Sequence, residues 1–155
     1  MKFLLLNVGK TNDKNIDSAI IEYNRKIQYY TSFDIKNLII KKNSSLIDKV
    51  KRNESEAIKK NINNNDYVIL LDSQGTSFNS VDFSKKISKL MISSTKRVVF
   101  VTGGAFGFHD EIYEIANEKI SLSQMTFTHQ MVRLIFVEQL YRSFTILNNQ
   151  AYHHN

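Results

Sequence analysis

Cysteine and proline are both absent from the 155 residues of the chain. Without cysteine the protein has no disulfide scaffold, no thiolate metal site and no cysteine nucleophile. No apolar run approaches the roughly 20 residues that a membrane-spanning helix needs, and the apolar start of the chain is too short for the hydrophobic core of a signal peptide. We therefore expect a soluble cytoplasmic protein that folds as one domain over residues 1–155.

The motifs of several common enzyme classes are also missing. The histidines do not show H-E-x-x-H spacing, so we expect no metal site among His109, His129, His153 and His154. A G-x-S-x-G nucleophile elbow, a G-x-G-x-x-G dinucleotide fingerprint and a G-x-x-x-x-G-K-[ST] phosphate loop do not occur either. These absences exclude the familiar serine and zinc hydrolases.

The net charge is +6, from 21 basic and 15 acidic residues. The whole excess lies in residues 1–60, which carry 13 Lys or Arg and 7 Asp or Glu. A basic surface is typical of proteins that bind nucleic acid. A general bias toward lysine, asparagine and isoleucine would give the same charge, so composition alone leaves both interpretations open.

Apolar periodicity predicts strands that alternate with helices along the chain. The predicted strands are 3–8, 33–40, 67–71, 97–101 and 119–122; the predicted helices are 16–30, 47–62, 83–90, 112–115 and 128–147, with Ser44 and Ser80 as N-caps of the second and third. This alternation is typical of a three-layer α/β domain with a mainly parallel sheet of about five strands. Because ligands bind at the carboxyl ends of such strands, the loops after the last three strands form the candidate site.

Two of these loops are rich in small and polar residues. The segment Gly103 to Gly107 permits close backbone approach to a ligand, although a glycine pair after a strand is more often only a tight turn. The segment 121–129 offers hydroxyl and backbone groups to a polar ligand. Alternatively, it is the start of a helix that Thr126 or Thr128 caps. The residues alone leave these alternatives open.

The last predicted helix is apolar around most of its circumference. Between residues 130 and 147 only Arg133, Glu138 and Arg142 are charged. A helix that is apolar nearly all round is buried, and at the end of a small chain such burial indicates a partner subunit. We expect a homodimer that forms through this C-terminal helix.

Three segments together resemble the 23S rRNA (pseudouridine-N3)-methyltransferases of the SPOUT superfamily. These segments are Val68–Gly75 (VILLDSQG), Phe100–Gly107 (FVTGGAFG) and Leu122–Arg133 (LSQMTFTHQMVR). The resemblance also includes Val8–Lys10, Glu22–Tyr23, Glu138–Phe144 and Ala151–His153, and so spans essentially the whole chain. The family usually has lysine where Thr76 stands and proline where Thr128 stands, and we expect both changes to loosen their loops.

The resemblance implies a C-terminal trefoil knot, a rare exception to unknotted chains, and a dimer with the last helix in its interface. It implies S-adenosyl-L-methionine as the cofactor, held in the knot largely by backbone groups. Carried over by motif, the cofactor-binding residues are Leu71, Gly104, Ser123, Gln124, Met125, Thr126, Phe127 and Thr128. No metal is implied.

The implied reaction is methylation of N3 of a pseudouridine in the helix 69 loop of 23S rRNA, within the assembled ribosome. The N3–H group is weakly acidic, so a base or a cation that stabilises the anion should help, and the candidates are His153 and Arg142. By position alone, His153 is more typical of a disordered tail, and it is the resemblance of Tyr152–His153 to the family that favours the catalytic role. The alternatives are a SPOUT methyltransferase with another rRNA or tRNA target and a non-catalytic RNA- or ribosome-binding module.

Overall fold

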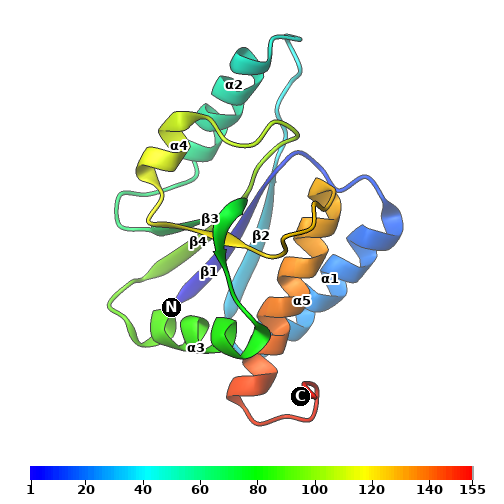
Figure 1. The fold of residues 1–155 in the computed structure, drawn as a ribbon, viewed down its shortest axis with the longest axis vertical. Coiled ribbons are helices and arrows are strands. Elements are labelled where there is room, and N and C mark those ends of the chain that lie inside the picture. Colours follow the sequence, from blue (N-terminus) through cyan, green and yellow to red (C-terminus); the bar gives the residue numbers. More distant parts are fainter. Residues whose placement is uncertain (155) are drawn as a thin grey trace.

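Residues 1–154, which the computed structural model describes, form five strands and five helices in strict alternation (Figure 1). The strands are β1 (Lys2–Val8), β2 (Ser32–Leu38), β3 (Tyr67–Ser77), β4 (Arg97–Thr102) and β5 (Glu118–Ser121). The helices are α1 (Lys14–Gln28), α2 (Ile47–Lys59), α3 (Ser80–Ile92), α4 (Asp110–Ile115) and α5 (His129–Leu147). Every predicted element is present, and most boundaries agree within three residues.

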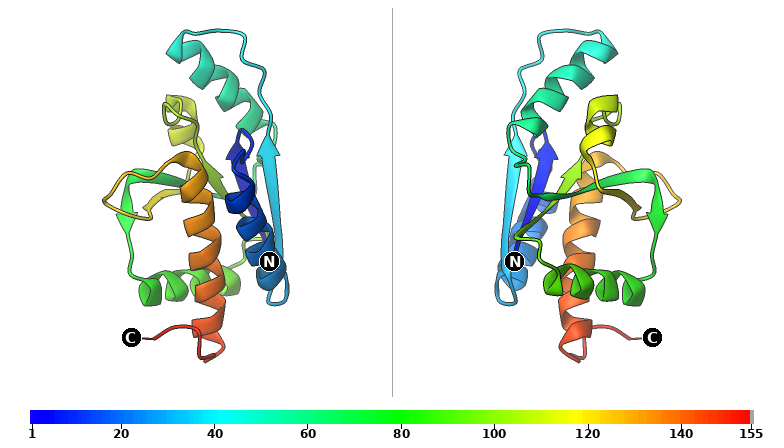
Figure 2. Two further views of the ribbon diagram at one scale, coloured as in Figure 1. Left: turned by 90° about the vertical axis from the view of Figure 1, so that its right-hand side faces the viewer. Right: turned by 90° about the vertical axis from the view of Figure 1, so that its left-hand side faces the viewer.

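The strands form one parallel sheet in the order β2-β1-β4-β3-β5. Parallel neighbours need crossover connections, and the helices supply them on both faces of the sheet. Helices α1, α3 and α5 cover one face and α2 and α4 cover the other (Figures 1 and 2). This arrangement confirms the predicted three-layer α/β fold.

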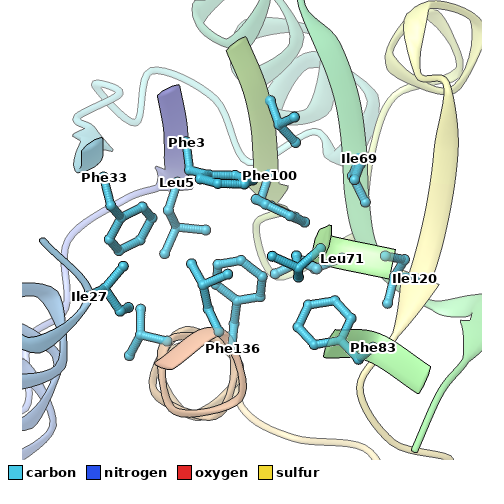
Figure 3. Close-up of a cluster of buried hydrophobic side chains, with 14 of the residues drawn as sticks. Phe3, Leu5, Ile27, Phe33, Ile69, Leu71, Phe83, Phe100, Ile120 and Phe136 are labelled. Carbon is cyan, nitrogen blue, oxygen red and sulfur yellow. The ribbon is translucent and has the colours of Figure 1, made fainter. Parts of the chain in front are cut away.

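Alternating residues of the strands feed two separate cores. Phe3 and Leu5 of β1 are buried against α1, α3 and α5, whereas Leu4 and Leu6 are buried against α2 and α4. In the larger core, Phe136 of α5 packs among side chains from β1, β3 and β4 (Figure 3). Burial on both faces explains why these strands are nearly continuous apolar runs rather than alternating ones.

A ladder of polar side chains crosses the sheet near its carboxyl edge. Asn7 donates to Asn37 Oδ1 and accepts from Thr102 Oγ1, each at 2.9 Å. The three residues occupy paired positions on β2, β1 and β4. Because Asn7 and Thr102 are buried, these bonds satisfy polar groups directly beneath the loops that form the candidate site.

The third and fifth helices begin with side-chain caps. Asn79 caps α3, and its side chain accepts from the Asp82 N–H at 2.8 Å, so the prediction of Ser80 as the cap is wrong by one residue. Both residue types can cap, but Asn79 is the one with extended backbone geometry. Thr128 caps α5 and accepts from the Met131 N–H at 3.3 Å, which decides between the two predicted caps.

The second helix lacks the predicted serine cap. Ser44 lies ahead of α2, and its hydroxyl accepts from the Leu46 N–H at 3.1 Å instead of from a helical N–H. The helix begins at Ile47, with Leu46 in the N-cap position and no side-chain hydrogen bond there. The serine therefore stabilises the turn that leads into the helix.

The third strand is longer than predicted. The sequence predicts a loop directly after Leu71, but β3 resumes after a register shift, and Thr76 pairs with Ile120 of β5. A Cβ added to Gly75 would lie 2.5 Å from the backbone nitrogen of Ile120. Glycine at position 75 therefore permits the two backbones to approach at this irregular pairing.

Candidate functional site

A pocket of about 830 Å³ lies at the carboxyl ends of β3 and β4, beside the start of α5. We call it the Leu71 pocket. Of the residues predicted to bind a cofactor, it is lined by Leu71, Gly104, Phe127 and Thr128. These residues come from three loops that are far apart in the sequence, so the fold brings half of the predicted set to one place.

The other half of that set, Ser123 to Thr126, lies in the loop between β5 and α5, outside the lining of the Leu71 pocket. The Ser121 hydroxyl donates to the Ser123 carbonyl, and the Met125 N–H donates to Ser123 Oγ, each at 2.9 Å. These bonds fold the loop on itself. The Met125 side chain is 76% exposed and lies outside the pocket lining, whereas Phe127 lines the pocket.

The loop after β4 forms the wall beside Leu71. The Gly107 N–H donates to the Gly104 carbonyl at 3.2 Å and closes a turn in which Gly107 has a φ of 75°. Other residue types resist this left-handed conformation, which explains the glycine at position 107. Of the two interpretations that the sequence left open, the tight turn is confirmed; the same segment lines the Leu71 pocket, and its contact with a ligand stays a prediction.

Sequence inspection missed a tyrosine that joins two walls of the Leu71 pocket. Tyr113 of α4 donates its hydroxyl to Asp72 Oδ2 at 2.6 Å, and both residues line the pocket. Burial, together with this bond to the carboxylate, raises the pKa of Tyr113 to about 12. The tyrosine therefore remains a neutral donor that holds the irregular middle part of β3, after Leu71, in place.

A second pocket, of about 490 Å³, lies at the carboxyl ends of β1 and β4 and is covered by α2. We call it the Glu54 pocket. It shares Gly104, Ala105 and His129 with the Leu71 pocket, so one wall separates the two. Strand β1 lies between β2 and β4, and the chain continues from β1 to β2. The boundary between β1 and β4 is therefore a point where the strand order reverses, and parallel α/β sheets bind ligands at such points.

Glu54 is the residue that sequence inspection overlooked in this pocket. It lies on α2, which the sequence predicts to be a basic amphipathic helix with an apolar stripe. Its carboxylate faces Gly104, because a Cβ added to that glycine would lie 2.5 Å from Glu54 Oε1. The side chain is half-buried, and burial raises the pKa of Glu54 despite the opposing charge of Lys51.

The loop between β1 and α1 is tied to α5 by two long-range contacts. Arg133 is fully buried and donates to the Val8 carbonyl at 2.6 Å and to Thr11 Oγ1 at 3.0 Å. Gln130 accepts from the Asp13 N–H at 2.9 Å. Burial lowers the pKa of Arg133 to about 10, and its Nε has no hydrogen-bond partner among the described residues.

The two predicted catalytic residues lie together, at the far end of α5. Arg142 approaches His153 Nδ1 at 3.4 Å and forms an ion pair with Glu138 at 2.5 Å. The hydrogen bonds to Glu138 raise the pKa of Arg142, so its guanidinium stays charged. Tyr152 also donates to Glu138, at 3.1 Å. The tail is thus folded against the helix rather than disordered.

This tail also contacts the first helix. The Tyr152 hydroxyl lies 3.2 Å from the Tyr23 hydroxyl, and the Tyr30 hydroxyl donates to Gln150. The start of α5, with His129, lines both pockets. Since 13 residues separate His129 from Arg142, a rise of 1.5 Å per residue puts Arg142 about 20 Å from the pockets of its own chain.

Two further features are absent from the described part of the chain. Across residues 1–154, no three histidine or carboxylate side chains gather in a way that could hold a metal ion. Within the same residues, no helix is both long enough and apolar enough to cross a bilayer.

Comparison with known proteins identifies the family. Residues 1–153 match the model of the family described as "Predicted SPOUT methyltransferase". The chain belongs to this SPOUT methyltransferase family. The SPOUT chain is 48% identical to the ribosomal RNA large subunit methyltransferase H of Phocaeicola vulgatus and 46% identical to that of Flavobacterium psychrophilum, in each case over 99% of both chains.

A solved structure supports the fold alone. The structure described as that of a probable methylase family protein from Haemophilus influenzae Rd KW20 matches the SPOUT chain with a TM-score of 0.56 and 13% sequence identity. The match covers 99% of this chain and 70% of the other.

The family resemblance noted in the sequence is confirmed by the family model and by the two relatives, which match over 99% of both chains.

Proposed function

We propose that this SPOUT chain methylates N3 of a pseudouridine in the helix 69 loop of 23S rRNA, with S-adenosylmethionine as the methyl donor and the assembled ribosome as the substrate. Support comes from the full-length relatives that are named large-subunit rRNA methyltransferases. The observation that carries the proposal is the Leu71 pocket, which joins three loops whose motifs resemble the family. Action on the ribosome would take place in the cytoplasm.

The residues of the Leu71 pocket fit the cofactor. A volume of about 830 Å³ lies in the usual range for small-molecule sites. Leu71 and Phe127 offer apolar surface to an adenine ring, and the loop after β4 offers backbone groups with little side-chain bulk. When bound, S-adenosylmethionine supplies an electrophilic methyl group. We also propose that the chain segment around this pocket forms the trefoil knot.

The positions of the predicted catalytic residues support a dimeric site. Arg142 and His153 lie about 20 Å along α5 from the pockets of their own chain. In a homodimer with antiparallel α5 helices, they would approach the Leu71 pocket of the second copy. Apolar residues of α5 that are only half-buried in the single chain, such as Leu134 and Ile135, would form the interface.

In this arrangement the two residues have different tasks. Arg142, kept charged by Glu138, stabilises negative charge as N3 loses its proton. His153, 3.4 Å from Arg142, accepts that proton. Alignment of the base with the methyl group supplies much of the remaining rate acceleration, roughly 7–11 kcal/mol in favourable intramolecular systems.

The test is mass spectrometry of 23S rRNA from cells that lack the gene, with and without a plasmid that restores it. We expect one methyl group on a helix 69 pseudouridine to disappear and return. Loss of a methyl group elsewhere would favour another RNA target, and no loss together with no binding of S-adenosylmethionine in calorimetry would favour a non-catalytic binding module. Light scattering should give about twice the 18.0 kDa chain mass; a species of 18.0 kDa would contradict the dimer.

A further inference from the structure

The Glu54 pocket lies directly beside the proposed cofactor site and shares Gly104, Ala105 and His129 with it. Its rim carries Lys10, Lys41 and Lys42, which are exposed and make no ion pair with any residue in the described range 1–154. Three cations around one opening attract phosphate groups. They come from two separate segments, the loop after β1 and the loop after β2, that line one pocket, which distinguishes them from a lysine-rich helix face.

The same rim carries an aromatic surface. Phe106, in the loop after β4, lines the Glu54 pocket with its side chain 52% exposed. Bases that are unstacked from RNA are commonly held against aromatic side chains of this kind. Cations beside an exposed aromatic ring suit a nucleotide better than they suit a free phosphate or an apolar molecule.

Inside the pocket, the Glu54 carboxylate needs a hydrogen-bond donor. In the part of the chain that the structure describes, no hydrogen bond or ion pair reaches this half-buried group. It lies 2.5 Å from the position that a Cβ would take on Gly104, and so faces the wall that both pockets share. A phosphate would be repelled there, whereas a group that presents an N–H or O–H can donate a hydrogen bond to Glu54.

We propose that the Glu54 pocket holds the target nucleotide, with Lys41 and Lys42 on its phosphates and with Glu54 accepting a hydrogen bond from N1–H of the pseudouridine. This inference rests on the proposed function. Pseudouridine has two ring N–H groups, and if N3–H faces the methyl group, N1–H is the donor that remains. Uridine has a C5–H at that edge, so Glu54 determines the specificity for pseudouridine over uridine.

The experiment measures binding to large ribosomal subunits from two strains. One strain lacks this enzyme, and the other also lacks the enzyme that makes the pseudouridine. Co-sedimentation in the presence of S-adenosylhomocysteine gives the affinity on each, and methyl transfer is measured in parallel. We expect the unmodified enzyme to prefer the pseudouridine subunits about tenfold, the discrimination expected from one buried hydrogen bond.

Glu54→Leu should abolish this preference while leaving affinity for the uridine subunits unchanged, and Glu54→Gln, which keeps an acceptor oxygen, should restore part of it. The matched control is Glu56→Leu, because Glu56 is exposed on the same helix outside the Glu54 pocket. Equal loss of preference in this control, or full preference in Glu54→Leu, overturns the assignment.

Lys41→Ala with Lys42→Ala should weaken binding to both kinds of subunit and reduce the dependence of log K on log salt by about two. The control pair is Lys89→Ala with Lys96→Ala. These lysines are exposed, on α3 and directly before β4, and neither lines the Glu54 pocket. An equal effect of this pair overturns the phosphate site.

Calorimetry separates the inference from the proposed function. Glu54→Leu should bind S-adenosylmethionine as the unmodified enzyme does; a tenfold loss would assign the carboxylate to the cofactor instead and overturn the inference. If the unmodified enzyme neither binds nor methylates either kind of subunit, the proposed function fails and the inference fails with it. If it methylates and the variants behave like it, only the inference fails.

Discussion

The Arg133 guanidinium donates to the carbonyl of Val8 at 2.6 Å and so joins the last helix to the end of the first strand, across 125 positions of the sequence. The arginine is fully buried, and it forms no ion pair within residues 1–154. Its two terminal nitrogens donate instead to a backbone carbonyl and to the Thr11 hydroxyl. Together with the bond from Asp13 to Gln130, this side chain therefore fixes the loop between β1 and α1, which borders both pockets.

Replacement of Arg133 tests that dependence. Arg133→Lys leaves either the Val8 carbonyl or the Thr11 hydroxyl without its donor, so we expect the free energy of unfolding to fall by roughly 1–3 kcal/mol. Urea unfolding at fixed protein concentration measures the change. Arg25→Lys, at an exposed position of α1, is the control and should alter stability by less than about 0.5 kcal/mol. Equal stability of the two variants would contradict the structural role.

Gly75→Ala tests the close pairing of β3 and β5. An added Cβ would lie 2.5 Å from the backbone nitrogen of Ile120, and no side-chain rotation can relieve a collision with backbone. We expect a loss of about 1–3 kcal/mol in unfolding free energy and faster hydrogen exchange at the Ile120 amide. Ser73→Ala, in the exposed part of the same strand, should change neither quantity.

Gly104 separates the two pockets, so its variants distinguish their roles. In Gly104→Ala the new methyl group meets the end of the flexible Glu54 side chain, which can rotate away. We expect stability to change by less than about 1 kcal/mol and the preference for pseudouridine subunits to be lost. In Gly104→Val the added bulk should also lower S-adenosylmethionine affinity, and calorimetry that shows unchanged affinity would refute that second expectation.

Glu54→Gln should stabilise the protein in a pH-dependent way. Burial raises the pKa of Glu54 in the folded protein, so the folded state binds this proton more tightly than the unfolded state. Protonation of Glu54 therefore stabilises the folded protein. This contribution is complete below the unfolded pKa of about 4.3, and it is lost as the pH rises through the pKa of Glu54 in the folded protein. Thermal unfolding should therefore show a higher Tm for the variant near neutral pH and no gain near pH 4.

The control for that experiment is Glu56→Gln, two positions along α2 and exposed. Its Tm relative to the unmodified enzyme should be the same at both pH values. A pH-independent effect of Glu54→Gln would show that burial does not destabilise the charged carboxylate, because water in the pocket solvates it.

Deletion of residues 152–155 tests the catalytic tail. We expect methyl transfer to be abolished, because the deletion removes His153 and the Tyr152 bond to Glu138. Calorimetry should show unchanged affinity for S-adenosylmethionine, because the Leu71 pocket is lined by other segments. Activity equal to that of the full chain would remove the tail from the mechanism.

The fold was predictable largely because β1, β4 and the first half of β3 are buried on both faces and are therefore apolar runs. Runs such as Val98 to Val101 read as buried strands by composition alone. The extension of β3 beyond Leu71 was not predictable, because its pairing depends on a register shift and a close approach at Gly75. Sequence patterns report which residues are apolar, not where a distant backbone will lie.

The candidate site was predictable only where loops carried recognisable motifs. Leu71 and Gly104 were found in this way, and the structure brings them to one pocket. Glu54 was not found, because a lone carboxylate on a basic helix gives no local signal. Its importance arises from a neighbour 50 positions away, Gly104, whose missing side chain makes room for it.

The contacts of Gln150 and Tyr152 with the first part of the chain bear on when the proposed proton acceptor is positioned. Tyr23 and Tyr30 meet these residues across 129 and 120 positions of the sequence. Contacts of such long sequence separation form late in folding. We therefore expect His153, next to Tyr152, to take its place against Arg142 only after the sheet and α5 have packed together.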